Sequence, residues 1–207
     1  MFRFLHRPKV GLALSVGGAR GIAHIGALKV LQREGIPIDF LAGASMGGVV
    51  AAGYAAGLGA EYMEREALRM GQLRNLLRLV DRSLPGPGLV SGKRVQDYFA
   101  RHLEEKSFDD LAIPLALVAA DLETGEEVVL QSGSVAEAVR ATVSMPGILA
   151  PFKADARLLI DGGVANPLPV DVVLCASAPL RLPSPFPRSR PLDPAGEATH
   201  LLVARGF

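Results

Sequence analysis

The sequence predicts an α/β protein, a three-layer α/β/α fold with a mostly parallel central sheet. Short apolar runs typical of buried strands alternate with segments whose apolar residues recur at helical spacing. The 207 residues suit one domain with a sizeable core, and 49% hydrophobic residues exclude a wholly disordered chain. Trp is absent and aromatic residues make up 5%, whereas Gly is plentiful at 23 residues, which favours closely packed backbones over an aromatic-rich β-sandwich.

The first half of the chain alternates strands and helices. Val10–Val16 is a short apolar run followed by two glycines, as expected of a buried strand. Ile25, Leu28 and Leu31 recur at helical spacing, and Gly35 is a natural helix end. The expected elements are strands over Val10–Val16 and Phe40–Ala42, helices over Ile22–Glu34, Met46–Ala56, Glu61–Val80 and Lys93–Glu104 (capped by Ser91), and a Pro- and Gly-rich loop over Asp81–Gly92.

The second half continues the alternation up to about Leu174. Thr124-Gly125 separates two apolar runs and indicates a hairpin. The expected elements are strands over Leu115–Ala120, Glu127–Gln131 and Arg157–Ile160, and a helix from its cap Ser134 through Val143. Six of the 15 prolines then fall between Pro179 and Pro194. We therefore expect one folded domain over residues 1–173 and an irregular Pro/Ser/Arg-rich tail over residues 174–207.

Charge and cysteine content narrow the class of protein. Twenty-two Lys and Arg against 21 Asp and Glu give a net charge of +1, which offers no electrostatic basis for nucleic acid as the main partner. The lone Cys175 excludes an internal disulfide and a Cys-based metal cluster. The apolar run Val10–Val16 is too short for a convincing signal peptide, and Phe40–Ala60 is too rich in glycine for a membrane span. We expect a cytoplasmic protein.

The segment Gly43-Ala44-Ser45-Met46-Gly47 matches the pattern G-x-S-x-G between an expected strand and an expected helix. A nucleophile on so tight a turn needs glycines on both sides, because the strained backbone must approach its neighbours closely. The start of the helix also favours developing negative charge. We interpret Ser45 as a candidate nucleophile; the alternative is a glycine-rich turn with a capping serine.

Two further segments carry candidate chemistry. Gly17-Gly18-Ala19-Arg20-Gly21 follows a strand and opens a helix, so its amides are suited to hold an oxyanion or a phosphate. The segment does not complete the dinucleotide pattern, because Val16 stands at its first position, and no Walker-type lysine follows. Asp161-Gly162-Gly163 places a carboxylate after a strand, where α/β folds carry catalytic groups, although an aspartate in a glycine turn is common.

Together these three segments resemble the patatin-like phospholipase family, which has a G-G-x-R/K-G loop, a G-x-S-x-G elbow and a D-G-G/A turn in this order. The resemblance runs from about Lys9 to Val173. It includes Ser91-Gly92, the segment at residues 120–125, Ser144-Met145-Pro146-Gly147 and the segment at residues 166–170.

The resemblance implies a serine acyl hydrolase of lipid or phospholipid carboxylic esters, without cofactor or metal. Ser45 would be the nucleophile and Asp161 its general base, in a dyad without histidine. The amides of Gly17, Gly18 and Ala19 would form the oxyanion hole, and the other motif residues would support the site: Arg20, Gly21, Gly43, Gly47, Gly162 and Gly163. The partners expected from the family are lipid substrates and a membrane surface in peripheral contact.

The sequence departs from the family pattern at two places. Val16 replaces the first glycine of the usual triple, which predicts a narrower oxyanion hole. After Asp171 the family continues with a helix and a hydrophobic strand, whereas this chain enters its Pro-rich tail. That difference predicts a missing sheet strand and exposed apolar neighbours. One alternative is therefore a truncated or altered family member that is inactive and serves as an interaction protein.

Other functions stay open from the sequence. A histidine-dependent hydrolase could use His200, which follows Ser45 and Asp161 in the chain, or His24 beside the glycine loop. Residues 17–21 could instead bind a nucleotide or phosphate, and the serine elbow could serve an acyltransferase. The apolar helix end at residues 76–80 and the Pro85–Leu89 loop are candidates to guard a pocket or to contact a membrane.

Overall fold

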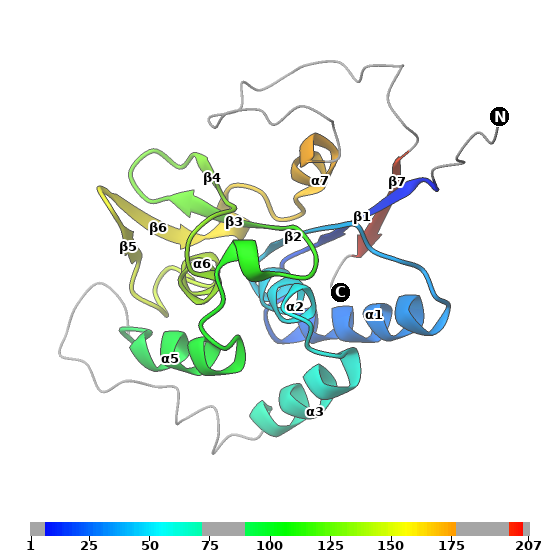
Figure 1. Cartoon of the computed structure of the whole chain (residues 1–207). Coiled ribbons are helices and arrows are strands. Elements are labelled where there is room, and N and C mark those ends of the chain that lie inside the picture. The colour runs from blue at the N-terminus through cyan, green and yellow to red at the C-terminus, as the bar shows by residue number, and fades with distance from the viewer. Residues whose placement is uncertain (1–6, 72–89, 177–198, 205–207) are drawn as a thin grey trace.

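The computed structural model describes residues 7–71, 90–176 and 199–204 of the chain (Figure 1). Strands and α-helices follow one another in the order β1 (Lys9–Leu14), α1 (Ala23–Arg33), β2 (Phe40–Ala44), α2 (Met46–Ala55), α3 (Ala60–Met70), α5 (Lys93–His102), β3 (Leu115–Asp121), β4 (Glu127–Leu130), α6 (Val135–Thr142), β5 (Phe152–Ala154), β6 (Arg157–Asp161), α7 (Val170–Ala176) and β7 (Thr199–Ala204). Short 3-10 helices are η1 (Gly18–Ile22), η3 (Phe108–Asp110) and η4 (Gly162–Val164).

The central sheet is mixed. Its strand order is β5-β6-β3-β2-β1-β7, and β4 pairs with β3 as the second strand of a hairpin. The pairs β7–β1, β1–β2 and β2–β3 are parallel, whereas β3–β4, β3–β6 and β5–β6 are antiparallel. The predicted α/β class is confirmed, with its parallel pairs on one side of the sheet and its antiparallel pairs on the other.

β2 and β6 approach β3 from opposite ends. The last residue of β2, Ala44, is level with Val118 of β3. The last residue of β6, Asp161, is level with the next residue of β3, Ala119. Ser45, the residue after Ala44, and Asp161 therefore reach the same level beside β3.

Hydrogen bonds at the two ends of β3 show that β2 and β6 use the same edge of that strand. Leu41 of β2 donates to the carbonyl of Pro114, and Leu122 donates to the carbonyl of Leu158 of β6. Residues 114 and 122 have the same parity, and alternate residues of a strand direct their backbone groups to one edge. β4 pairs with the opposite edge. The two strands thus meet end to end, and the ladder along this edge is interrupted between them.

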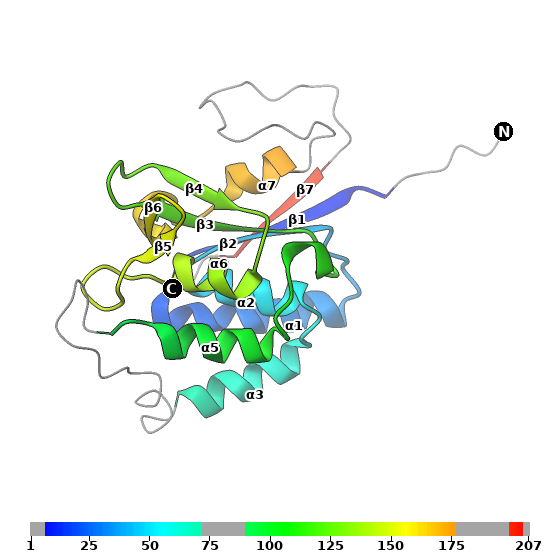
Figure 2. The same cartoon turned by 60° about the vertical axis from the view of Figure 1, so that its left-hand side comes forward.

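Helices cover both faces of the sheet unequally (Figures 1 and 2). α7 lies on one face, over β1, β2 and β7. α1, α2 and α6 lie on the other face, with α3 and α5 farther from the sheet. Leu12 and Leu14 of β1 belong to the large core on this second face, whereas Ala13 between them belongs to a smaller cluster under α7. This alternation is expected of a strand buried on both faces.

The structure confirms most of the elements predicted from the sequence. The hairpin over β3 and β4 is present, and Ser134 caps α6 by accepting a hydrogen bond from the amide of Glu137. Ser91 accepts from the amide of Lys93, although Gly92 is the residue at the cap of α5. The helix predicted to reach Val80 is described as α3 only to Met70, and residues 72–89 lie outside the described residues. β5 was not predicted.

The expectation of an irregular tail without a sheet strand is wrong for Thr199–Ala204. These residues form β7, which runs parallel to β1 from Lys9 opposite Thr199 to Leu14 opposite Ala204. β1 is therefore covered on this side instead of forming a bare edge. The expectation that the family's helix after Asp171 gives way to the tail is also wrong, because α7 spans Val170–Ala176 and ends three residues past the predicted boundary. The division of the chain at residue 173 stays a prediction.

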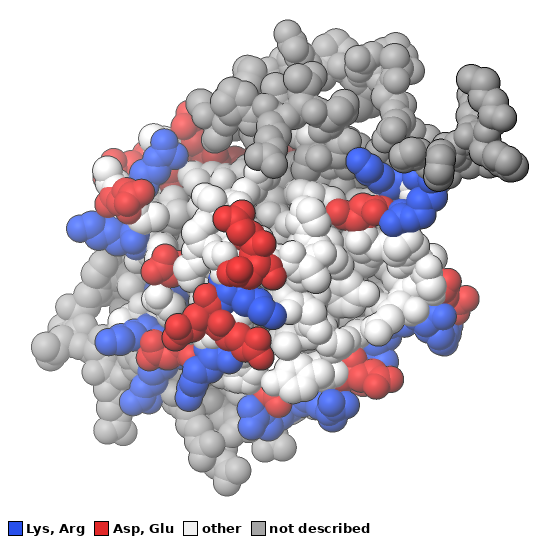
Figure 3. All heavy atoms as spheres, in the orientation of Figure 1, with Lys and Arg blue, Asp and Glu red and all other residues white. Residues whose placement is uncertain are grey.

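The described surface carries both signs of charge. Figure 3 shows acidic and basic side chains interspersed on the face turned to the viewer. Arg7 pairs with Asp39 at 2.7 Å, and Lys29 of α1 pairs with Glu64 of α3 at 2.8 Å. Exposed pairs of this kind contribute little to stability. Within the described ranges, no helix is long and apolar enough to cross a membrane.

Candidate active site

Ser45 lies at the sharp turn between β2 and α2, in a backbone conformation that residues other than glycine rarely adopt. Its φ is 52° and its ψ is −126°. Holding a serine in such a conformation costs about 1–3 kcal/mol, so the surrounding contacts must fix it. The residue is 5% exposed and lines a pocket. The predicted strand–turn–helix context of the G-x-S-x-G segment is confirmed.

Gly43 and Gly47 allow backbone segments to meet around this turn. A Cβ atom on Gly47 would lie 2.3 Å from the carbonyl oxygen of Ser15 and 2.4 Å from that of Leu14. A Cβ atom on Gly43 would lie 2.7 Å from the carbonyl group of Gly47. These contacts are too short for any side chain. The first turn of α2 therefore rests directly on the end of β1, which fixes the Gly-rich loop relative to Ser45.

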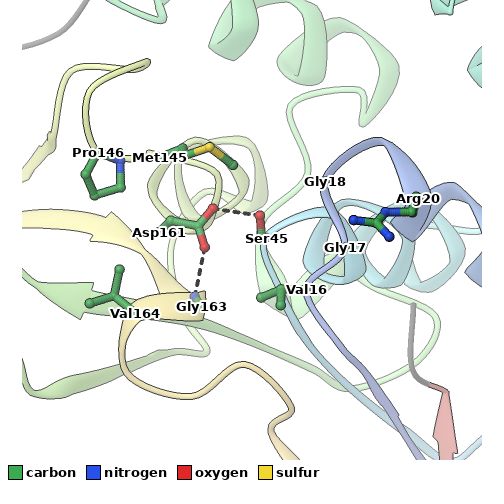
Figure 4. A pocket seen from close by; sticks show the side chains of 10 residues that line it. All are labelled: Val16, Gly17, Gly18, Arg20, Ser45, Met145, Pro146, Asp161, Gly163 and Val164. Atoms are coloured by element: carbon green, nitrogen blue, oxygen red, sulfur yellow. Dashed lines mark hydrogen bonds between the residues drawn. The ribbon is translucent and has the colours of Figure 1, made fainter. Parts of the chain in front are cut away.

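Asp161 ends β6 and faces Ser45 (Figure 4). Ser45 Oγ donates a hydrogen bond to Asp161 Oδ2 at 2.6 Å, and the amide of Gly163 donates to Oδ1 at 2.8 Å. The aspartate is 6% exposed. Burial raises the pKa of Asp161 above its ordinary value, while the hydrogen bonds from Ser45 and Gly163 act in the opposite direction. A raised pKa makes the carboxylate a stronger base toward the serine hydroxyl.

The Gly-rich loop follows β1 and continues into η1. The carbonyl of Gly17 accepts hydrogen bonds from the amides of Arg20 and Gly21, at 3.0 and 3.3 Å, so these two amides are directed into the loop. Among the described residues, no hydrogen bond starts from the amides of Gly17, Gly18 or Ala19. Gly17 and Gly18 line the pocket, whereas Ala19, the third predicted oxyanion residue, is exposed and is not among the lining residues. The loop is not the complete ring of amides that a phosphate nest would offer.

A pocket of about 430 Å³ lies over the serine and the aspartate. Its lining consists of Val16, Gly17, Gly18, Arg20, Ser45, Met145, Pro146, Asp161, Gly163 and Val164. Figure 4 shows Met145, Pro146 and Val164 on the side of Asp161 and Arg20 across the loop on the other side. Met145 and Val164 are 40% and 56% exposed, so apolar surface extends to the mouth of the pocket. The pocket has an apolar side and a cationic side.

Comparison with known proteins identifies the family of the chain. The family model of patatin-like phospholipases matches residues 12–174, which contain all three motifs. The chain belongs to the patatin-like phospholipase family. An uncharacterised NTE family protein of Mycobacterium tuberculosis is 39% identical over 175 residues, which cover 84% of this chain and 48% of that protein. Neuropathy target esterase sws of Drosophila melanogaster is 32% identical over 175 residues, 83% of this chain and 12% of that protein.

Solved structures of similar fold include two larger bacterial proteins. VipD from Legionella pneumophila has a TM-score of 0.61 at 15% identity and covers 96% of this chain and 50% of its own. ExoU of Pseudomonas aeruginosa, solved with SpcU, has a TM-score of 0.54 at 21% identity and covers 95% of this chain and 43% of its own. At these identities the likeness shows the fold alone. The matched part of this chain spans about half the length of the mycobacterial relative and 12% of the length of the fly esterase.

His200 and His24 are the two histidines that the sequence offers as alternative partners of Ser45. Nε2 of His24 donates to the carbonyl of Ser15 at 2.9 Å, and the ring is 2% exposed, so burial lowers the pKa of His24. His200 lies on β7 level with Val10, about 13 Å along the strand from the Leu14 end that approaches the elbow. Within the described part of the chain, the hydrogen-bond partner of Ser45 Oγ is Asp161 and not a histidine.

Two residues contact the Ser45–Asp161 pair through hydrogen bonds that were not predicted from the sequence. Thr142, the last residue of α6, accepts a hydrogen bond from the amide of Ser45 at 2.9 Å through its Oγ1. The carbonyl of Ser144 accepts from the amide of Asp161 at 3.0 Å. Ser144 belongs to the Ser-Met-Pro-Gly segment noted in the sequence, but the contact of Thr142 depends on tertiary structure that no local pattern records.

The remaining predictions concern regions without a described site. The apolar helix end at residues 76–80 and the Pro85–Leu89 loop lie outside the described residues. In the ranges that are described, no group of three or more His, Cys, Asp or Glu side chains is arranged to hold a metal ion. Cys175 is exposed near the end of α7.

Proposed function

We propose that this patatin-like domain is a serine acyl hydrolase that cleaves carboxylic esters of lipids or phospholipids, with Ser45 as nucleophile and Asp161 as general base. The observation that carries the proposal is the 2.6 Å hydrogen bond from Ser45 Oγ to Asp161 Oδ2. A nucleophile and its base must lie within such a distance for proton transfer. The strained backbone at residue 45 and the pocket above it support the same function.

In the first half-reaction, Ser45 Oγ forms a bond to the ester carbonyl carbon while its proton passes to Asp161 Oδ2. The carbonyl oxygen becomes an oxyanion, for which the amides of Gly17, Gly18 and Ala19 are the candidate donors. The tetrahedral intermediate then expels the alcohol, which takes the proton from Asp161. The products are an acyl-serine and a free alcohol.

The proton transfer has to be concerted with attack on the carbonyl. The pKa of an ordinary carboxyl lies roughly ten units below that of an alcohol, so a free alkoxide is not accessible. Burial raises the pKa of Asp161 and so narrows this gap, and the hydrogen bond from Gly163 keeps the carboxylate oriented. The oxyanion donors supply the rest of the stabilisation; the loss of one donor typically costs about 10²–10³-fold in rate.

In the second half-reaction, water replaces the alcohol. Asp161 accepts a proton from the water as its oxygen attacks the acyl carbon, and it returns that proton to Ser45 as the acyl group leaves. The same carboxylate therefore serves both steps. Acyl transfer to an alcohol in place of water would follow the same route, and the products distinguish the two.

The walls of the pocket support a lipid ester as substrate. Met145, Pro146 and Val164 offer apolar surface for an acyl chain on the side of Asp161. Arg20 lies across the loop, where a guanidinium is suited to a phosphate or carboxylate. An amphipathic ester with one acyl chain and an anionic head group matches both sides.

The test compares hydrolysis of p-nitrophenyl butyrate and of a lysophospholipid by the wild-type protein, Ser45→Ala and Asp161→Asn. We expect both substitutions to lower kcat/KM by about 10³-fold or more. Ser132→Ala and Asp109→Asn change exposed residues of the same types and are expected to keep wild-type activity. A fluorophosphonate probe should label the wild type at Ser45 alone.

Equal hydrolysis by the wild type and both site variants would disprove the proposal, because no catalytic serine would then be involved. A folded wild-type protein that neither hydrolyses esters nor reacts with the probe would favour the inactive alternative. Transfer of the acyl group to added alcohol at the expense of free acid would indicate an acyltransferase.

A further inference from the structure

The interruption in the ladder along β3 leaves backbone groups that neither β2 nor β6 can satisfy. β2 ends at Ala44, level with Val118, and β6 ends at Asp161, level with Ala119. The carbonyl of Val118 and the amide of Ser45 lie at this interruption, where no strand residue pairs with them. Both groups are buried, and buried backbone groups need partners.

The hydroxyl of Thr142 supplies the partner for both groups. Its Oγ1 donates to the carbonyl of Val118 and accepts from the amide of Ser45. One hydroxyl has one donor and two acceptor lone pairs, so it can bridge a carbonyl and an amide where a methyl group could bridge neither. Thr142 therefore ties the nucleophile's backbone to the strand against which Asp161 is registered.

The surroundings of Thr142 fix the direction of its hydroxyl. The side chain is 0% exposed, and its Cγ2 methyl packs against Gly48 of α2, where an added Cβ would lie 3.0 Å from that methyl. A β-branched side chain has few χ1 rotamers, so a methyl seated against α2 leaves the hydroxyl directed at the elbow. Thr at this position provides both contacts at once.

The same segment also holds the other member of the dyad. The carbonyl of Ser144, two residues further on, accepts from the amide of Asp161. The guanidinium of Arg140, one turn earlier on α6, donates to the hydroxyl of Ser144. The last residue of α6 thus contacts Ser45 through its side chain, and Ser144, two residues beyond the helix, contacts Asp161 through its backbone.

We propose that Thr142 is a positioning residue, whose hydroxyl holds the backbone of Ser45 so that its Oγ stays in hydrogen-bond reach of Asp161. This inference rests on the proposed function of the dyad. The residue touches no substrate and acts only through Ser45. Its contribution should appear in kcat and in the rate of acylation, because the position of the nucleophile affects the chemical step more than substrate binding.

The experiment measures kcat and KM for p-nitrophenyl butyrate with the full chain carrying Thr142→Val, Thr142→Ser or Val139→Ala, alongside Ser45→Ala. Valine keeps the shape of threonine and removes only the hydroxyl, whereas serine keeps the hydroxyl. Val139 is also on α6 and 0% exposed, but it packs in the main core and not on the elbow, so its truncation is the matched control for loss of packing. Thermal unfolding by circular dichroism accompanies each variant.

We expect Thr142→Val to lower kcat by about 10²-fold with little change in KM, because displacements near 1 Å cost rates of this order. Thr142→Ser should restore most of kcat, and Val139→Ala should keep it despite a lower melting temperature. If Thr142→Val does not fold, Thr142→Ala carries the same expectation.

The proposal is overturned if Thr142→Val keeps the wild-type kcat, if Thr142→Ser is as impaired as Thr142→Val, or if Val139→Ala loses kcat to the same extent. A wild-type protein no more active than Ser45→Ala would instead contradict the proposed function itself. The two failures are therefore distinguishable in one set of measurements.

Discussion

Substitution of Gly47 by alanine tests whether close contact between β1 and α2 sets the geometry of the elbow. The new Cβ would lie 2.3 Å from the carbonyl oxygen of Ser15, 2.4 Å from that of Leu14 and 2.6 Å from the carbonyl carbon of Leu14. All three are backbone atoms, so no side-chain rotation relieves the overlap. The shortest contact has to lengthen from 2.3 Å to at least 3.0 Å, which moves the end of β1 away from α2.

The magnitude follows from two opposing effects. Overpacking costs about 1–3 kcal/mol, while alanine gains about 1 kcal/mol over glycine in a helix. We expect Gly47→Ala to be destabilised by up to about 2 kcal/mol, a drop in Tm of up to roughly 8 °C for a chain of this size. Because the displaced strand leads into the loop at Gly17 and Gly18, kcat should also fall by about 10²-fold.

Gly26→Ala is the matched control. Gly26 lies on the exposed side of α1, and a Cβ there meets no atom within 4 Å. It should raise stability by up to about 1 kcal/mol and leave esterase kinetics unchanged. Circular dichroism melts and p-nitrophenyl butyrate kinetics measure both variants. Wild-type Tm and kcat in Gly47→Ala would refute the idea that this contact fixes the site.

Three other predictions concern single side chains. Because burial raises the pKa of Asp161, the acid limb of the pH profile of kcat/KM should lie at higher pH than an ordinary aspartate would give. For the same reason, the wild type should lose stability relative to Asp161→Asn as pH rises through that pKa. Thermal melts of both proteins from acid to neutral pH check this, and a constant difference in Tm would contradict it. His24→Leu should cost about 1–3 kcal/mol by removing the buried hydrogen bond from the ring to the carbonyl of Ser15, whereas His24→Gln, which keeps an N–H donor, should cost less. Equal melting temperatures for the two variants would argue against the role of this bond. Arg20→Gln should lower kcat/KM about tenfold for an anionic lysophospholipid and leave kcat/KM for neutral p-nitrophenyl butyrate unchanged. An equal loss of kcat/KM on both substrates would mean that Arg20 shapes the loop instead of binding the anion.

Local patterns were sufficient for the parts of the fold that form from neighbouring residues. The strand, turn and helix around Ser45, the hairpin across Thr124-Gly125 and the capped start of α6 all have short-range signals. The direction of β6 has no such signal, because an apolar run looks the same whichever way its partner runs. β7 was missed because the prolines before it dominate the composition of the tail, although Leu201-Leu202-Val203 is itself a short apolar run.

The site shows the same division. Ser45 and Asp161 could be identified as candidate site residues from the glycines around them, since tight turns need glycine at fixed offsets. The rule that places catalytic groups at the carboxyl ends of parallel strands indicated Asp161, yet β6 is antiparallel to β3. Thr142 could not be found, because a threonine inside an amphipathic helix pattern gives no sign that its hydroxyl completes the ladder of a strand 24 residues earlier.

The interrupted ladder offers a physical reason why the proposed dyad would need no histidine. In a triad, a third residue orients the base; in this fold Asp161 is oriented by the amide of Gly163 on its carboxylate and by the carbonyl of Ser144 on its own amide. Both contacts come from the backbone and are formed on folding, so little further ordering is needed when substrate binds. The cost is a strained serine and a buried carboxylate, each destabilising at neutral pH, which the packed ends of β2, β6 and α6 must offset. Substitutions that loosen this junction should therefore reduce activity before they unfold the domain.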